Sequence, residues 1–293
     1  MKRLLISLIV IGIIGAALGM FITRPQHVDP QRFATLEGDA MAGEQVFWAG
    51  GCASCHTAEE SENQLQLPGG RHFATDFGTF IAPNISPDPT HGLGGWTLTE
   101  FASAMLHGTS PDGSHYYPSF PYSTYARMTD KDVADLWAFL QTIPLMDRAN
   151  EPHELGFPFN VRLSLGGWKL LFLSDDWVVP VSGDELERGR YLVEALGHCG
   201  ECHTPRNALG GPDLARWMTG APNPSGKGRI PGITPAQLDW AAADIAYYLE
   251  TGFTPDFDSA GGEMAEVIDN MSRLSAEDRN AIAAYVKALP SVE

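Results

Sequence analysis

The sequence predicts a mainly α-helical protein, built as two tandem domains of the same kind after an N-terminal transmembrane helix. Three observations predict this fold class. An unbroken apolar run opens the chain, one short cysteine pattern occurs twice, and a helical pattern of similar length closes each half. The chain has 293 residues, enough for two domains of about 100–150 residues each. Its 31 glycines and 21 prolines indicate compact helices joined by long loops.

The N-terminal segment has the composition of a membrane anchor. Lys2 and Arg3 precede an apolar run from Leu4 to Ile22, and the next charged residue is Arg24. At about 1.5 Å per residue, this run comes close to the ~30 Å hydrocarbon core. A cleaved signal peptide has a similar charged start, but its apolar core is usually only about 7–15 residues long. We therefore predict an uncleaved, single-pass anchor over residues 1–23, in the cytoplasmic (inner) membrane, with the remainder in the periplasm.

All four cysteines lie in two copies of one pattern, C-A-S-C-H at residues 52–56 and C-G-E-C-H at residues 199–203. The spacing C-x-x-C-H is the attachment site for c-type haem. The thiols that would add to the haem vinyl groups are Cys52, Cys55, Cys199 and Cys202. The histidines that would bind the two irons on one side are His56 and His203. The sequence therefore predicts two covalently bound haem c groups.

Two other uses of cysteine pairs fit the pattern less well. A zinc ribbon brings its two pairs together over about 15–20 residues, whereas these pairs are separated by half of the chain. A thioredoxin-like redox pair needs neither the histidine nor the duplication. Both alternatives leave unexplained why a histidine directly follows each pair.

The chain is an internal duplication. Cys52 lies 92 residues before Pro144, and Cys199 lies 91 residues before Pro290. We expect domains at residues 38–144 and 183–290, with separate cores. The connector, residues 145–182, is rich in proline and aromatic residues. We expect it to be structured and packed against a domain through Trp168 and Phe172, in preference to a contact with the membrane surface.

Each repeat is expected to cross its first helix with its last. The closing helices are predicted at Thr129–Gln141 and Ser275–Leu289, from apolar residues at helical spacing. Each opens with a hydroxyl and, three residues later, a carboxylate (Asp132 and Asp278), which are expected to cap free backbone N–H groups. Two glycines in the first helices should allow close backbone approach, Gly43 beside Phe139 and Gly189 beside Tyr285.

The net charge of −17 argues against nucleic-acid binding, which needs a basic surface. Trp96 and Trp240 hold matching places in the repeats and are expected to pack near the haem edges. Nothing in the sequence resembles a catalytic triad, a phosphate-binding loop or a dinucleotide-binding motif. Five loop histidines are further candidates for an iron ligand, although a loop histidine is usually solvated: His72, His91, His107, His115 and His153.

Each repeat resembles a class I cytochrome c domain. More narrowly, the chain resembles the cytochrome subunits of bacterial membrane-bound alcohol and gluconate dehydrogenases. The segments that carry this likeness are N-I-S-P-D at 84–88, G-G-W at 94–96, Y-P-S-F-P-Y at 117–122 and G-E-M at 262–264. The resemblance implies an electron-transfer role and a methionine as the second iron ligand. Those subunits usually carry three haem domains, whereas this chain has two.

Methionine sulfur is the usual partner of histidine in such relay proteins. For the second haem the resemblance points to Met264, and Met271 is expected to be a core residue. In the first repeat the family's methionine is replaced by Phe120, which cannot bind iron. Met128, just before Thr129, is the expected substitute, because its loop must pass the haem face and it aligns with Leu274. His115 and an open iron remain alternatives, while Met105 is expected to be packing.

The expected function is an electron relay from a periplasmic or membrane-bound dehydrogenase, or a quinol, to a terminal oxidase or small cytochrome. The alternative is a two-haem peroxidase-like enzyme whose first iron keeps an open position. Ligation of that iron distinguishes the two.

Overall fold

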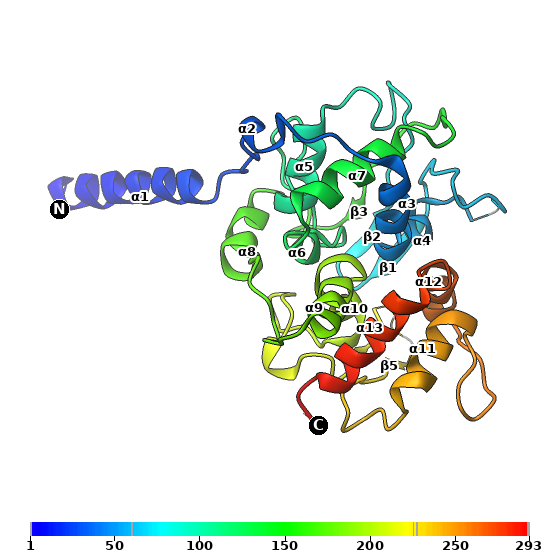
Figure 1. The fold of residues 1–293 in the computed structure, drawn as a ribbon. Coiled ribbons are helices and arrows are strands. Elements are labelled where there is room, and N and C mark those ends of the chain that lie inside the picture. Colours follow the sequence, from blue (N-terminus) through cyan, green and yellow to red (C-terminus); the bar gives the residue numbers. More distant parts are fainter. Residues whose placement is uncertain (1, 60, 225, 227, 292–293) are drawn as a thin grey trace.

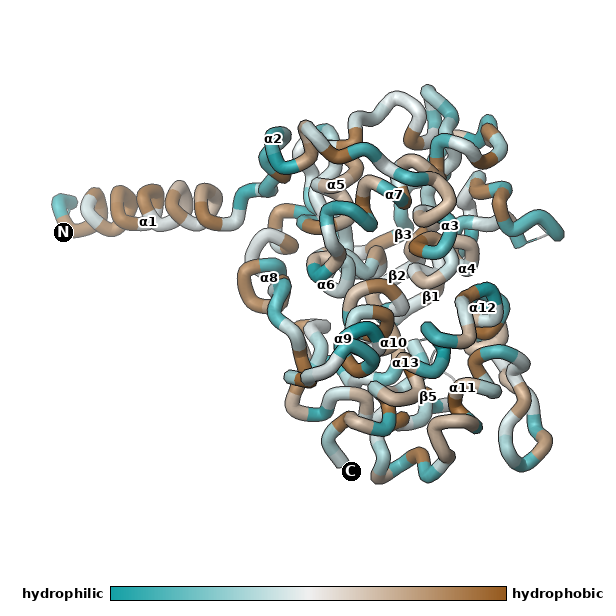
Figure 2. The backbone as a smooth tube through the Cα atoms, viewed as in Figure 1, coloured by the Kyte–Doolittle hydropathy of each residue, from teal (hydrophilic) through white to brown (hydrophobic). Residues whose placement is uncertain are grey.

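The computed structural model describes residues 2–59, 61–224, 226 and 228–291. Helix α1 (Lys2–Ile22) projects from the body as a single rod, and none of its residues is buried (Figure 1). Figure 2 shows that this rod is apolar along nearly its whole length. Within the described part of the chain, it is the one helix long and apolar enough to cross a membrane.

The first domain surrounds the first C-x-x-C-H segment with short helices and a small antiparallel sheet. Its elements are α2 (Pro30–Phe33), α3 (Ala40–Ala49), α4 (Cys52–His56), β1 (His72–Thr75), β2 (Gly78–Ile81), α5 (Leu98–His107), α6 (Tyr122–Tyr125) and α7 (Asp130–Leu140). In the sheet, β1 and β2 form a hairpin with Phe73 opposite Phe80. Strand β3 (Glu154–Leu155) of the connector pairs with the other edge of β2.

The second domain repeats this plan around the second C-x-x-C-H segment. Its elements are α9 (Asp184–Tyr191), the π-helical turn η1 (Leu192–Leu196), α10 (Cys199–His203), η2 (Leu214–Arg216), β4 (Ala221–Pro222), β5 (Arg229–Ile230), α11 (Ala242–Thr251), α12 (Glu263–Met271) and α13 (Ala276–Ala288). The first helix, the motif helix and the closing helix thus occur in the same order in both domains (Figure 1).

The first and last helices of each domain cross at a glycine, as predicted. A Cβ atom on Gly43 of α3 would lie 1.9 Å from the backbone oxygen of Asp135 in α7. A Cβ atom on Gly189 of α9 would lie 2.0 Å from the backbone oxygen of Ala281 in α13. The predicted neighbours are the next groups that these Cβ atoms would meet, namely Phe139 and Tyr285. No side chain fits at either crossing, and this allows the helix backbones to touch.

The closing helices begin at the predicted capping residues, Thr129 and Ser275. Each hydroxyl accepts a hydrogen bond from the backbone N–H three residues later, at 3.1 and 3.0 Å. The prediction that the two carboxylates also cap these helices is wrong. Asp132 accepts a hydrogen bond from the Tyr191 hydroxyl, and Asp278 forms an ion pair with Arg188 at 2.7 Å. Helix α9 passes both helix starts and supplies these stronger partners.

The connector is structured and bridges both domains. Its helix α8 (Ser164–Phe172) packs Trp168 on the ring of Tyr122 in the first domain, with centroids 6.2 Å apart. Phe172 packs directly on Gly211 of the second domain. A Cβ atom on Gly211 would lie only 2.4 Å from the Phe172 ring. The predicted packing through Trp168 and Phe172 is therefore confirmed.

The prediction of separate cores is wrong. Buried apolar side chains from both domains form one continuous cluster, from Val28 to Leu289. The turn η1 packs on α3 and α6, and α12 packs on α3 and α4, so each domain buries apolar residues against the other. A cluster of this kind couples the stability of the two halves.

Candidate functional site

Each C-x-x-C-H segment forms a short helix directly after a residue with left-handed backbone conformation. Helix α4 follows Gly51 (φ 63°), and α10 follows His198 (φ 42°). Glycine adopts this conformation at little cost, whereas histidine is strained there. The His198 ring lies 6.0 Å from the ring of Tyr125 in the other domain. Tyr125 in turn donates a 2.9 Å hydrogen bond to the carbonyl of Gly50. The strained residue therefore stands where the two motifs approach each other.

No disulfide joins any of the four cysteines, which all lie in the described part of the chain. Burial raises the pKa of the Cys52 and Cys199 thiols to about 12 each, so neither ionises near neutral pH. A thioredoxin-like pair needs a thiol with a lowered pKa. Among the residues that the structure describes, no three histidine, cysteine or acidic side chains gather as a metal site. The geometry therefore supports neither the redox-pair nor the zinc alternative.

The motif histidines are held identically in the two domains. His56 Nδ1 lies 2.8 Å from the carbonyl oxygen of Pro83, and His203 Nδ1 lies 2.8 Å from that of Pro231. A carbonyl only accepts, so Nδ1 carries the proton and Nε2 keeps its lone pair. Burial lowers the pKa of both imidazoles, which favours the neutral form that binds metals. Two thiols beside an oriented, neutral imidazole fit a covalently attached haem.

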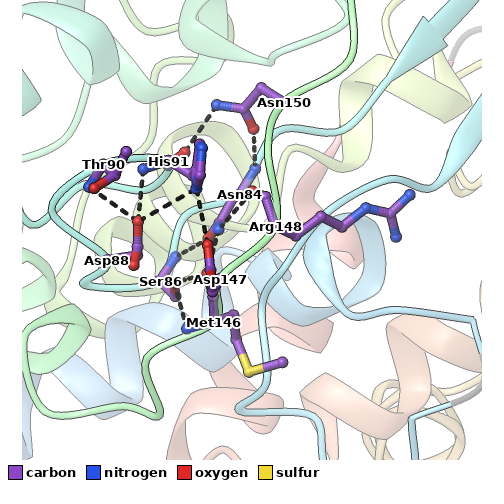
Figure 3. A network of polar contacts seen from close by, with 9 residues as sticks. All are labelled: Asn84, Ser86, Asp88, Thr90, His91, Met146, Asp147, Arg148 and Asn150. Atoms are coloured by element: carbon purple, nitrogen blue, oxygen red, sulfur yellow. Dashed lines mark hydrogen bonds and ion pairs between the residues drawn. The ribbon is translucent and has the colours of Figure 1, made fainter.

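A polar network fixes the loop that carries the Pro83 carbonyl (Figure 3). The Asn84 side chain donates to the carbonyls of Met146 (2.6 Å) and Arg148 (3.1 Å), and its oxygen accepts from the Ser86 N–H (2.9 Å). The backbone N–H of Asn84 donates to the Asn150 side chain at 2.7 Å. These bonds tie the loop to the start of the connector. The N-I-S-P-D segment thus orients His56 indirectly, a role that the sequence alone does not reveal.

The methionines occupy distinct places. Met264 lies in the first turn of α12 and is half-buried against the core, whereas Met271 at the end of this helix is buried, as expected. Met105 is buried within α5, also as expected. Met128 is 4% exposed and Leu274 is 5% exposed, each directly before the cap of its closing helix. The two residues therefore hold equivalent buried positions.

Three of the five loop histidines contact other polar groups through their rings. His115 is buried, and its Nε2 lies 3.0 Å from the Thr23 carbonyl at the end of the N-terminal helix. His153 Nδ1 accepts from the Ile81 N–H at 3.1 Å, and His91 Nδ1 lies 3.1 Å from an Asp147 oxygen. His72 is exposed in β1, and His107 ends α5. Thr23 therefore engages the Nε2 of His115, whereas its buried Nδ1 has no hydrogen-bond partner among the described residues. Trp96 and Trp240 both pack against the core cluster.

The third residue of each C-x-x-C-H segment contacts the other domain. Glu201 accepts hydrogen bonds from the hydroxyls of Ser123 (3.1 Å) and Thr124 (3.0 Å), which belong to α6 in the first domain. Ser54 accepts a hydrogen bond from the Asn270 side chain (2.8 Å), which belongs to α12 in the second domain. Both α6 and α12 lie between the middle helix and the closing helix of their repeats. The contacts are reciprocal, so the two motifs face each other across one interface.

An ion pair reinforces the same interface. Arg71 of the first domain donates to the Ser54 carbonyl and to both carboxylate oxygens of Glu266 in α12. Glu266 lies two residues after Met264, so one arginine joins the first motif to the helix that carries Met264. On the other side, Arg206 pairs with Glu201. The charged contacts at the interface thus cluster around the two motifs.

The comparison with known families agrees with this geometry. The family model of cytochrome c matches residues 40–144 and again residues 186–290, one match for each C-x-x-C-H segment. The chain belongs to the cytochrome c family. Two such domains, each with one attachment motif, make it a dihaem cytochrome c with two covalently bound haem c groups.

Similar proteins include a dihaem cytochrome and several dehydrogenase subunits. The cytochrome c is 60% identical to the dihaem cytochrome c-type protein of Cereibacter sphaeroides over the whole of both chains. It is 36% identical to the fructose dehydrogenase cytochrome subunit of Gluconobacter japonicus, over 92% of this chain and 56% of that subunit. It is 33% identical to the alcohol dehydrogenase (quinone) cytochrome c subunit of Gluconacetobacter polyoxogenes, over 89% of this chain and 60% of that subunit. This chain thus spans less than two thirds of those two subunits.

Proposed function

We propose that this dihaem cytochrome c is an electron relay, anchored in the cytoplasmic membrane by residues 1–23 with both haem domains in the periplasm. Its donor is a dehydrogenase and its acceptor is an oxidase or a small cytochrome. The similarity to cytochrome subunits of dehydrogenases supports the donor class. The acidic surface, with a net charge of −17, suits partners that present basic patches.

Haem c supplies a reversible one-electron centre when bound. We propose that Cys52, Cys55, Cys199 and Cys202 would hold the two haems covalently, and that the irons would be bound by His56 and Met128 in the first domain and by His203 and Met264 in the second. The carbonyls of Pro83 and Pro231 hold each imidazole in one tautomer and one orientation. A ligand held this way does not need to reorient when the charge of the site changes.

The reciprocal interface is the observation that carries the relay function. Glu201 and Ser54 dock each motif on the other domain, and the shared core holds the two halves in one arrangement. Electrons that enter one domain can therefore reach the other inside a single chain, without diffusion.

Removing the Glu201 contact is expected to slow electron exchange between the haems. In Glu201→Ala, Ser123 and Thr124 lose their acceptor and Arg206 keeps only the Gly210 carbonyl, so one of the two reciprocal contacts that hold the motifs in register is lost. The exchange is measured by reducing one haem with a flash and monitoring the absorbance of both haems over time. Its rate should not depend on protein concentration, and it should fall severalfold in the variant.

A second variant acts on the same contact from outside the motif. Ser123→Ala combined with Thr124→Val removes both hydroxyl donors and leaves haem attachment untouched, so it should reproduce the slowing. Glu37→Ala, on an exposed carboxylate outside the interface, is the control and should exchange electrons at the wild-type rate. If both interface variants keep the wild-type rate, this interface is not the route between the haems.

The first distal ligand can be tested without disturbing the core. Leucine occupies the position equivalent to Met128 in the second domain, so Met128→Leu should fold normally. It removes the thioether, and it should lower the potential of the first haem and abolish its weak sulfur-to-iron band. Met271→Leu is the matched control and should change neither property. An unchanged potential and band in Met128→Leu would make Met128 a packing residue.

A further inference from the structure

Helix α8 exposes apolar side chains and buries its charged one, which is the reverse of an ordinary surface helix. Its outward side carries exposed leucines, with Leu163 at its start 57% exposed and Leu170 and Leu171 each 65% exposed. Its one charged residue, Lys169, is only 9% exposed and points inward. A helix on a water-soluble domain normally buries its apolar stripe and exposes its charges. Figure 2 shows the outer turn of α8 as apolar.

The inward side of α8 is firmly attached to the first domain. Lys169 Nζ donates to the carbonyl oxygens of His107 (2.7 Å) and Gly108 (2.6 Å), at the C-terminal end of α5, where a positive charge is favourable. It also lies 4.8 Å from the ring centroid of Tyr122. The outward leucines are therefore a fixed property of the fold, because the helix cannot roll over without breaking these contacts.

Helix α8 touches the chain at the point where the N-terminal helix ends. A Cβ on Gly166 would lie 2.1 Å from the carbonyl oxygen of Thr23, which directly follows the last residue of α1. The same oxygen is 3.0 Å from His115 Nε2. If α1 spans the bilayer, Thr23 lies at its surface, and α8 lies at the same depth. Figure 1 shows α8 on the side of the body from which α1 projects.

The segment that follows α1 fixes this orientation. The Val28 N–H donates to Ser103 Oγ at 3.0 Å, and the side chains of Val28 and Phe33 are buried in the first domain. Arg32 forms an ion pair with Asp130 at the start of α7. The segment directly after the anchor is therefore docked on the first domain, which turns the same face of the body toward the membrane.

We propose that the outward face of α8, with the exposed apolar residues just before it, lies in the interface of the membrane that α1 spans. The residues before the helix are Phe157, Phe159 and Val161, which are also exposed. This inference rests on the anchor in the proposed function. An apolar helix face at the level of the lipid headgroups is the arrangement of interfacial helices. The net charge of −17 argues against attraction to anionic lipid as the driving force. Insertion of the exposed leucines into the membrane interface is the driving force instead. Trp168 and Phe172 keep the domain contacts expected for the connector.

Labelling from inside the bilayer tests the proposal on the full-length protein. The purified dihaem protein is reconstituted in vesicles of zwitterionic lipid that contain a photoactivatable acyl chain, and labelled peptides are mapped after digestion. We expect label in α1 and in residues 157–172. Phe257 is 95% exposed on the second domain and should remain unlabelled. The double variant Leu170→Glu with Leu171→Glu should lose most of the label in α8 and keep it in α1.

The outcomes separate the inference from the proposed anchor. Label in α1 with none in residues 157–172 would overturn the inference and leave the anchor intact; the face would then belong to a partner protein. Equal label in α8 and around Phe257 would also overturn it, because the labelling would then follow exposure alone. Protein that is released from the vesicles with no label in α1 would reject the anchor itself.

Discussion

Replacing Gly189 by alanine is expected to lower the free energy of unfolding by about 3 kcal/mol, because overpacking a close helix contact forces the backbones apart. The new Cβ would lie 2.0 Å from the Ala281 oxygen and 2.7 Å from Tyr285 Cβ, and a backbone oxygen cannot rotate away. Alanine's better helix propensity would return only about 0.5–1 kcal/mol. Because the core is continuous, the whole chain should still unfold in one transition, shifted to lower denaturant concentration. Circular dichroism during chemical unfolding measures this shift.

Gly167→Ala is the matched control for this prediction. Gly167 also lies within a helix, but no atom comes within 4 Å of its Cβ position. The substitution should therefore be neutral or stabilise the protein by up to about 1 kcal/mol. Comparable losses in both variants would show that helix propensity, and not the crossing of α9 and α13, governs the result.

The double variant Cys52→Ala with Cys55→Ala is expected to leave one covalently bound haem per chain in place of two, because no thiol remains at the first motif. The intact mass of the denatured protein measures this directly, because only thioether-linked haem survives denaturation. The loss should also destabilise the second domain, since α12 of that domain packs on α3 and α4 beside Cys52. This second effect follows from the shared core and would not arise in two independent domains.

Ser54→Ala changes the same motif and is the control for haem attachment. It removes one hydrogen bond, from Asn270, and leaves both thiols in place, so both haems should remain. Two haems retained in the denatured double cysteine variant would refute the attachment at the first motif. A second domain with unchanged stability in that variant would contradict the coupling of the halves.

Features encoded within one repeat could be predicted from the sequence. The closing helices follow from apolar spacing and their capping hydroxyls, and the glycine crossings follow from the match between Gly43 and Gly189. These signals are local, or they recur at the same place in both repeats. The C-x-x-C-H pattern is equally local, because its chemistry lies within five consecutive residues.

Features that depend on how the domains dock could not be predicted. The contact between Glu201 and Ser123 joins residues 78 positions apart and carries no periodic signal. Separate cores were expected because each repeat has its own helical pattern, yet η1 and α12 turn apolar residues toward the other domain. In the sequence, a lysine among leucines is expected to face solvent. Lys169 points inward because the last carbonyl groups of α5 accept its hydrogen bonds, which the sequence does not reveal.

Carbon monoxide binding to the reduced full-length protein tests the relay function most directly. A haem with both axial positions filled by protein ligands does not take up the gas at neutral pH, whereas an iron with an open position does. We expect the visible spectrum of the reduced dihaem protein to remain unchanged under carbon monoxide. A shift of the Soret band that accounts for one of the two haems would contradict the relay and favour a peroxidase-like enzyme.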